Sequence, residues 1–149
     1  MNAFVTGNEE ETMNVGASLG AELQPGDVVL LYGQLGAGKT AFVRGLAHGV
    51  GASPDEVSSP TFTLVQEYAG ASATLYHVDL YRLEPKEVDD LGLEELVSAD
   101  GIVAIEWADR WTGRPDDVIQ VWIEEAGEEK RSIRVSRPER RSRPTQLGS

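Results

Sequence analysis

The sequence contains no cysteine, which excludes disulfide bonds and thiolate chemistry. It has no apolar run near the ~20 residues that a membrane-spanning helix needs, so we expect no membrane partner. Residues 1–6 show no basic segment followed by an apolar one, so no secretory signal peptide is expected. The last two absences favour a cytoplasmic protein. A length of 149 residues fits one domain with a sizeable core.

Positive charge is also scarce, except at the C-terminal end. The chain has 13 Lys and Arg residues against 25 Asp and Glu residues, and its net charge is −12. Residues 130–149 hold seven basic residues against Glu139 and carry +6, which leaves −18 for residues 1–129. An acidic body repels a phosphate backbone, so we expect its main face to bind neither DNA nor RNA directly. Residues 137–149 are predicted to form a basic, flexible tail, with contact to RNA or to an acidic protein as the alternative.

One glycine-rich stretch matches the phosphate-binding P-loop pattern G-x-x-x-x-G-K-[ST]. It reads Gly33-Gln34-Leu35-Gly36-Ala37-Gly38-Lys39-Thr40. The apolar run 27–32 before it is typical of a buried strand, and Ala41 opens a run, 41–47, with helical spacing. The order strand, glycine loop, helix is the context that this motif requires.

The residue types in this stretch suit a phosphate group. Glycines let backbone N–H groups point inward at an anion, and the dipole of the following helix adds to the attraction. Lys39 would reach the β- and γ-phosphates, and the Thr40 hydroxyl would bind Mg²⁺. The alternative is a glycine-rich turn with an exposed lysine.

The remaining patterns predict an α/β fold. Asn8 is a candidate helix cap with Glu11 three residues later, and the run 101–106 has the continuous apolar character of a central parallel strand. The other predicted elements are hairpins at 61–68 with 73–79 and at 118–123 with 131–135, and short helices at 85–91 and 93–98. We therefore predict a single P-loop NTPase domain over residues 1–136. It would be a three-layer sandwich whose mixed sheet has a parallel core and antiparallel hairpins.

Two carboxylates end predicted strands. Glu106 closes the apolar run 101–106, and Asp79 closes the alternating strand 73–79. Ligands of open α/β sheets bind at the carboxyl ends of the strands, so we expect both residues beside the glycine loop. We assign Glu106 to the metal, directly or through water, and Asp79 to a second acid that orients a metal-bound or attacking water. The alternative for each is a carboxylate that caps a helix or pairs with an arginine.

Other signals of nucleotide chemistry are few. The chain has no Asn-Lys-x-Asp motif for guanine and no lid insert of a small-molecule kinase, and residues 89–92 match Asp-x-x-Gly without a preceding strand. His48 and His77 have no metal-ligand partners in the pattern and are interpreted as structural or exposed. Thr12 shares a helical face with Val15, and its spacing alone favours an ordinary first-turn residue over a hydroxyl aimed at a ligand.

Four motifs follow one another along the chain. They are the loop at 31–40, Ser-Pro-Thr-Phe-Thr-Leu-Val at 59–65, Tyr-His-x-Asp-Leu-Tyr-Arg-Leu at 76–83, and Glu-Trp at 106–107. In this combination the chain resembles the bacterial TsaE (YjeE) family over about residues 8–135. That family is the ATPase component of the threonylcarbamoyladenosine modification of tRNA.

The resemblance implies ATP as the nucleotide and Mg²⁺ held by Thr40 and Glu106. It places Asp79 at an essential acid position and Trp107 beside the site, and it implies a switch-like loop at residues 59–61, for which a simple strand entrance is the alternative. The ATP-binding residues that it implies are Thr12, Gly33, Leu35, Gly36, Ala37, Gly38, Lys39, Thr40, Asp109 and Arg131. Gln34 departs from the pattern, because the family commonly has Asp there.

The resemblance also implies partners and an activity. The family acts on a TsaD–TsaB complex, which carries the tRNA and the transfer chemistry, so tRNA would be reached indirectly. We expect a Mg²⁺-dependent ATPase with Lys39, Asp79 and Glu106 as catalytic residues. It would be slow alone, because the chain offers no obvious arginine finger. Arg82 is the best internal candidate, but an ordinary ion pair is the favoured interpretation for it. A nucleotide-gated binding switch, whose hydrolysis only resets the complex, and a small-molecule kinase are the other functions considered.

Overall fold

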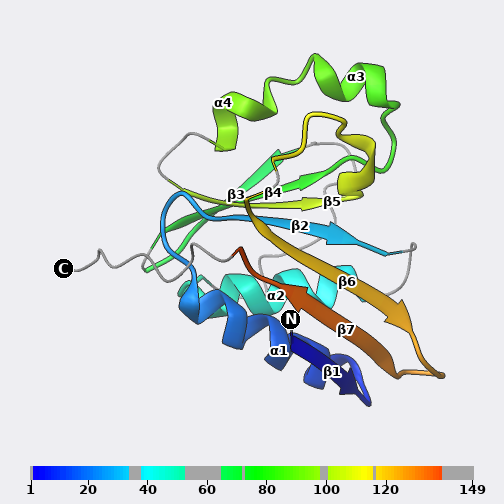
Figure 1. The fold of residues 1–149 in the computed structure, drawn as a ribbon. Helices are drawn as coiled ribbons and strands as arrows, with labels where there is room; N and C mark the ends of the chain where they lie inside the picture. Colours follow the sequence, from blue (N-terminus) through cyan, green and yellow to red (C-terminus); the bar gives the residue numbers. More distant parts are fainter. Residues whose placement is uncertain are drawn as a thin grey trace.

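The computed structural model describes residues 2–33, 38–52, 65–71, 73–97, 101–115 and 117–138. These ranges hold one seven-stranded sheet with the order β1-β7-β6-β2-β5-β4-β3 (Figure 1). The strands are β1 Asn2–Thr6, β2 Val28–Tyr32, β3 Val65–Ala69, β4 Thr74–Asp79, β5 Ile102–Glu106, β6 Ile119–Glu125 and β7 Arg131–Ser136. The helices are α1 Glu9–Glu22, α2 Lys39–Gly49, α3 Pro85–Asp89, α4 Leu93–Val97 and the 3₁₀ turn η2 Ala108–Arg110. None of the helices in these ranges has the length and apolar character to cross a bilayer.

The middle of the sheet is parallel and its edges are antiparallel. Strand β2 pairs in parallel with β5 and β6, and β4 pairs in parallel with β5. Strands β3 and β7 pair antiparallel with β4 and β6. The predicted mixed sheet, its parallel core and both hairpins are therefore confirmed. The central loop residues 34–37 and the predicted switch loop at 59–61 lie outside the described residues.

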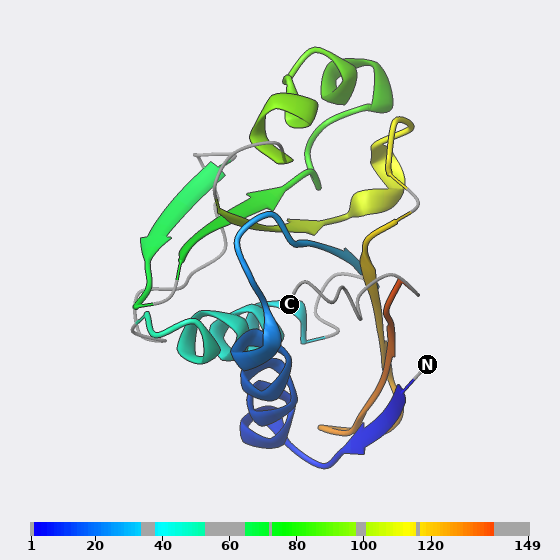
Figure 2. The ribbon, with the colours of Figure 1, turned by 60° about the vertical axis from the view of Figure 1, so that its left-hand side comes forward.

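Two hydrophobic cores lie on opposite faces of the sheet. On β2, Val29 and Leu31 pack under α1 and α2, whereas Val28 and Leu30 pack in the core of α3, α4 and η2. This alternation is the period of two that a strand imposes on its side chains. The two helix layers and the sheet between them are visible in Figures 1 and 2, and they form the three layers that the sequence predicts.

Helices α1 and α2 pack with their backbones in close contact. A Cβ atom added at Gly45 would lie 2.0 Å from the carbonyl oxygen of Met13, and one added at Gly16 would lie 2.3 Å from that of Phe42. Gly20 and Gly49 repeat this arrangement one turn further along, with added Cβ atoms 2.5 Å from carbonyl oxygens of the facing helix. Only hydrogen atoms fit at these four positions, which we call the glycine seam.

Strand β1 is not predicted by any pattern in the sequence. Residues Asn2–Thr6 pair antiparallel with β7, and the first four of them are exposed. The exposed run lacks the alternation that marks a half-buried strand, so its pairing comes from β7 rather than from its own pattern. Just beyond β7, Arg137 holds the same corner through an ion pair of 3.0 Å with Glu22 and a hydrogen bond to the Asn2 side chain.

The glycine seam makes a testable prediction for stability. We expect Gly45→Ala to lower the free energy of unfolding by about 1–3 kcal/mol, because the added methyl must push α1 away from α2. Urea unfolding followed by circular dichroism measures this. Gly7→Ala is the control, since a Cβ at this exposed glycine meets only the flexible Glu11 side chain, at 3.3 Å. A variant Gly45→Ala as stable as the parent would contradict the close backbone contact.

Candidate functional site

A cavity of about 480 Å³ lies between the start of α2 and the carboxyl ends of β4 and β5. Its lining brings together eight of the residues predicted from the sequence, which are Thr12, Gly38, Lys39, Thr40, Asp79, Glu106, Trp107 and Arg131. Glu9, Ala41 and Glu129 complete the lining. Segments from both ends and from the middle of the chain therefore meet at one place.

The start of α2 forms one wall of this cavity. Gly38 precedes the helix with φ = 98°, a left-handed conformation that glycine adopts without strain. Among the described residues no side chain makes a capping hydrogen bond there, and the positive end of the helix dipole, which favours an anion, lies at the cavity. Arg131, at the start of β7, runs alongside, because a Cβ added at Gly38 would lie 3.4 Å from its Nε.

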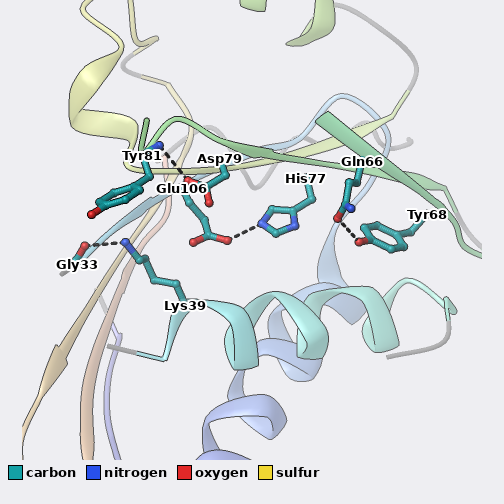
Figure 3. A network of polar contacts seen from close by, with 8 residues as sticks. All are labelled: Gly33, Lys39, Gln66, Tyr68, His77, Asp79, Tyr81 and Glu106. Carbon is teal, nitrogen blue, oxygen red and sulfur yellow. Dashed lines mark hydrogen bonds and ion pairs between the residues drawn. The ribbon is translucent and has the colours of Figure 1, made fainter. Parts of the chain in front are cut away.

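Lys39 is a buried cation at the first position of α2, with 4% of its surface exposed. Its Nζ donates a hydrogen bond of 2.7 Å to the Gly33 carbonyl (Figure 3). The same Nζ lies 3.9 Å from the centre of the Trp107 ring. Burial lowers the pKa of Lys39, while the carboxylates of Glu106 and Asp79 oppose that shift. The ammonium group is thus poorly hydrated and close to negative charge, a state in which a phosphate ligand would stabilise it.

Asp79 and Glu106 lie side by side because their strands pair in register. In the parallel pairing of β4 with β5, Asp79 stands opposite Glu106. Leu75 and Ala104 belong to the core under α1 and α2, and the period of two carries both carboxylates to that same face. Burial raises the pKa of Asp79, and the neighbouring charge of Glu106 raises it further, whereas the N–H of Tyr81, which donates to Asp79 over 3.0 Å, lowers it.

The oxygen atoms around Lys39 suit a small, hard cation. The Thr40 hydroxyl and the carboxylates of Asp79 and Glu106 line one cavity, and Mg²⁺ prefers such oxygen ligands. Across the described ranges, no three His, Cys, Asp or Glu side chains gather closely enough to hold a metal on their own. This donor set fits Mg²⁺, which usually takes only one or two carboxylates and completes its shell with water and phosphate.

Trp107 lies between this cavity and a second one. It has φ = 60° and is the only non-glycine residue with a left-handed backbone in the part of the chain that the structure describes. Such a conformation is strained in a bulky residue and is typical of functional sites. The ring contacts Lys39 on one side and lies 5.0 Å from the Tyr81 ring.

The second cavity has a volume of about 590 Å³ and is lined by two residues that were predicted to bind the nucleotide with those of the first. Gly33 and Asp109 line it, together with Tyr32, Trp107, Trp122, Ile123, Glu124 and Glu125. Asp109 lies in η2, just after the turn at Trp107. Asp109 therefore shares a cavity with Gly33 rather than with Lys39, although its charge acts on Lys39 and Trp107 lines both cavities.

The position at which α1 starts places Thr12 beside the first cavity. The Asn8 side chain accepts the Glu11 N–H over 2.8 Å, which confirms the predicted cap. Thr12 then falls in the first turn, 1% exposed, and shares a hydrogen bond of 2.7 Å with the Thr6 hydroxyl. The position next to the cavity agrees with the resemblance rather than with the preference drawn from spacing alone.

His77 is the site residue that sequence reasoning missed. It is completely buried, and its Nε2 lies 2.5 Å from Oε2 of Glu106 (Figure 3). A signal was present, because a residue two positions before Asp79 on a strand points to the same face. His48 is exposed, one of its two predicted outcomes. Arg82 is also exposed, and the ion pair expected for it is not found among the described residues.

Comparisons with known proteins give a consistent picture. The family model described as "Threonylcarbamoyl adenosine biosynthesis protein TsaE" matches residues 6–133. A protein of Nostoc sp. named tRNA threonylcarbamoyladenosine biosynthesis protein TsaE is 42% identical over 91% of this chain and 86% of its own length. The protein of that name from Bacillus subtilis is 43% identical over 86% of this chain and 80% of its own length. A crystal structure of Bacillus subtilis YdiB superposes with a TM-score of 0.77 at 33% identity, covering 97% of this chain and 91% of that one.

The raised pKa of Asp79 makes a prediction for stability against pH. An unfolded chain loses this proton near the ordinary value of 3.8, whereas the folded protein keeps it to higher pH, so stability falls as the pH rises through that window. We expect Asp79→Asn to be more stable than the parent at pH 7 and equally stable below pH 3.8.

Urea unfolding at pH 7 and at about pH 3.5 measures this difference. Asp90→Asn is the matched control, since Asp90 is exposed at the end of α3 and lies away from the cavity. A loss of stability at pH 7 in Asp79→Asn alone would show that the charged form is favoured in the fold.

Proposed function

This chain belongs to the TsaE family of tRNA threonylcarbamoyladenosine biosynthesis proteins, and on that basis we propose that it is the Mg²⁺-dependent ATPase of this modification. The observation that carries the proposal is the convergence of Lys39, Asp79 and Glu106 on one cavity at the uncapped start of α2. A buried cation, backbone donors and two adjacent carboxylates are the parts that phosphoryl transfer needs.

Each group has a definite task in this proposal. The N–H groups at the start of α2 and the Lys39 ammonium bind the β- and γ-phosphates and stabilise the charge that develops on the transferred group. Thr40 and Glu106 hold Mg²⁺, which neutralises phosphate charge when it is bound. Asp79 accepts a hydrogen bond from the attacking water and orients it in line with the γ-phosphate. Its raised pKa makes it a better proton acceptor than an exposed aspartate.

We further propose that the chain acts on a TsaD–TsaB complex and reaches tRNA only through it. The charge of −18 on residues 1–129 supports this division, because an acidic body repels the tRNA backbone. We also propose that the chain alone hydrolyses ATP slowly. Within the described ranges, no arginine side chain other than Arg131 lines the cavity beside Lys39, so a partner would supply further stabilisation.

A nucleotide-gated binding switch is the second function that a specific observation favours. Trp107 contacts Lys39 and also lines the second cavity, so a phosphate that draws Lys39 away from Gly33 would disturb both sides of the ring. Hydrolysis would then only reset the complex. A non-hydrolysable ATP analogue that supports one round of tRNA modification, but not many, would identify this function.

Lys39 gives the direct test of hydrolysis. We expect Lys39→Ala to lower phosphate release from ATP by about 100-fold or more, measured with TsaD and TsaB present, because the charge on the transferred group loses its main protein partner. Lys86→Ala is the matched control, since Lys86 is exposed on α3. Equal activity of the parent and Lys39→Ala would rule the proposal out.

Trp107 provides an optical test of nucleotide binding. We expect ATP with Mg²⁺ to change the tryptophan fluorescence, because a phosphate competes with the Trp107 ring and the Gly33 carbonyl for the Lys39 ammonium. The change should disappear in Trp107→Phe and persist in Trp122→Phe, whose ring lies in the second cavity. A response that follows Trp122 instead would place the nucleotide elsewhere.

A further inference from the structure

The proposed function gives no task to His77, although this residue makes the closest polar contact of the site. The imidazole is completely buried in β4, and Glu106 is 4% exposed. His77 Nε2 lies 2.5 Å from Glu106 Oε2, and the two side chains that share this hydrogen bond are 0% and 5% exposed. A buried carboxylate oxygen needs such a partner, because solvent cannot supply one.

The other ring nitrogen shows in which direction the hydrogen bond runs. Nδ1 of His77 is buried and has no hydrogen-bond partner in the described part of the chain. A proton on Nδ1 would be a donor without an acceptor, which native proteins avoid more strictly than an unused acceptor. A proton placed on Nε2 avoids that cost, and the imidazole then donates it to the Glu106 carboxylate.

The sheet holds this donor at a fixed place. His77 pairs with Ala104 on β5, one inward-facing position before the pair of Asp79 with Glu106. Ala104 presents only a methyl group opposite the imidazole, so the ring can reach diagonally to the Glu106 carboxylate. Both strands belong to the parallel core of the sheet, and neither end of the hydrogen bond lies in a loop.

We propose that His77 is a positioning residue that occupies Oε2 of Glu106 and leaves only Oε1 for a metal. In Figure 3 the second carboxylate oxygen of Glu106 lies on the side of Lys39, away from His77. The inference rests on the assignment of Mg²⁺ to Glu106 in the proposed function. Mg²⁺ binds few carboxylates and keeps much of its water, whereas Ca²⁺ often takes both oxygens of one carboxylate. His77 therefore favours Mg²⁺ over Ca²⁺ by withholding the second oxygen.

Three substitutions separate the hydrogen bond from the bulk of the ring. His77→Leu fills the space without a donor, His77→Gln carries an amide N–H that reaches about as far as Nε2, and His77→Asn carries one that is too short. Calorimetric titration of Mg²⁺ and of Ca²⁺ into the protein saturated with a non-hydrolysable ATP analogue measures both affinities. We expect the Leu and Asn variants to lose about 10- to 100-fold in Mg²⁺ affinity and less in Ca²⁺ affinity.

The Gln variant should stay within about threefold of the parent for both metals. Analogue binding without a divalent ion should be the same in all variants, which a general loss of structure would not allow. If His77→Leu fails to fold, the difference in Mg²⁺ affinity between His77→Gln and His77→Asn still tests the hydrogen bond. In a Glu106→Gln background, His77→Leu should cause no further loss of Mg²⁺ affinity, because the two residues act through one contact.

Two results would overturn the inference, and they are distinguishable. If Glu106→Gln weakens Mg²⁺ binding while the His77 Leu and Asn variants keep the Mg²⁺ affinity and the Mg²⁺-to-Ca²⁺ ratio of the parent, His77 is only a core residue. If Glu106→Gln itself leaves Mg²⁺ affinity unchanged, the metal assignment of the proposed function fails, and the role of His77 fails with it.

Discussion

The parallel pairing of β4 with β5 determines where the polar side chains of the site lie. One register places Asp79 beside Glu106 and, two residues earlier, brings His77 within reach of the same carboxylate. A shift by one residue would turn all of β4's inward side chains to the opposite face of the sheet. The register is held by apolar neighbours on both faces, Leu75 and Val78 among them, which are completely buried. The positions of the polar side chains in the site therefore depend on the packing of apolar side chains around β4.

Much of this arrangement could be predicted, because several signals are local. The continuous apolar run of β5 and the alternation of the hairpins reveal strands, and a residue that ends a parallel strand lies at the ligand-binding edge. The contact of His77 with Glu106 could not be predicted, since it requires knowing that β5 is the neighbour of β4. The placement of Asp109 could not be predicted either: it follows a left-handed turn at Trp107 and lines the second cavity, and its charge acts on Lys39. No sequence pattern marks such a turn at a tryptophan.

Burying the charges of Lys39 and Asp79 in the site lowers the free energy of unfolding near neutral pH. Burial shifts the pKa of Lys39 downward and that of Asp79 upward, so each group is moved toward its neutral form. Groups perturbed in this way by burial and by one another gather at functional sites more often than elsewhere. The hydrogen bond to the Gly33 carbonyl and the contact with the Trp107 ring offset part of the free energy that burying the Lys39 charge costs. Trp107 makes this contact from a strained, left-handed backbone.

The glycine seam has a consequence for motion as well as for packing. Helix α1 carries Thr12 on one wall of the cavity, and α2 carries Lys39 on another. Helices that meet through side chains can slide by changing rotamers, as in shear motions. At the seam no side chains lie between the facing backbones, so this freedom is missing there. We therefore expect α1 and α2 to move together, so that Thr12 and Lys39 keep their relative position when the cavity changes shape.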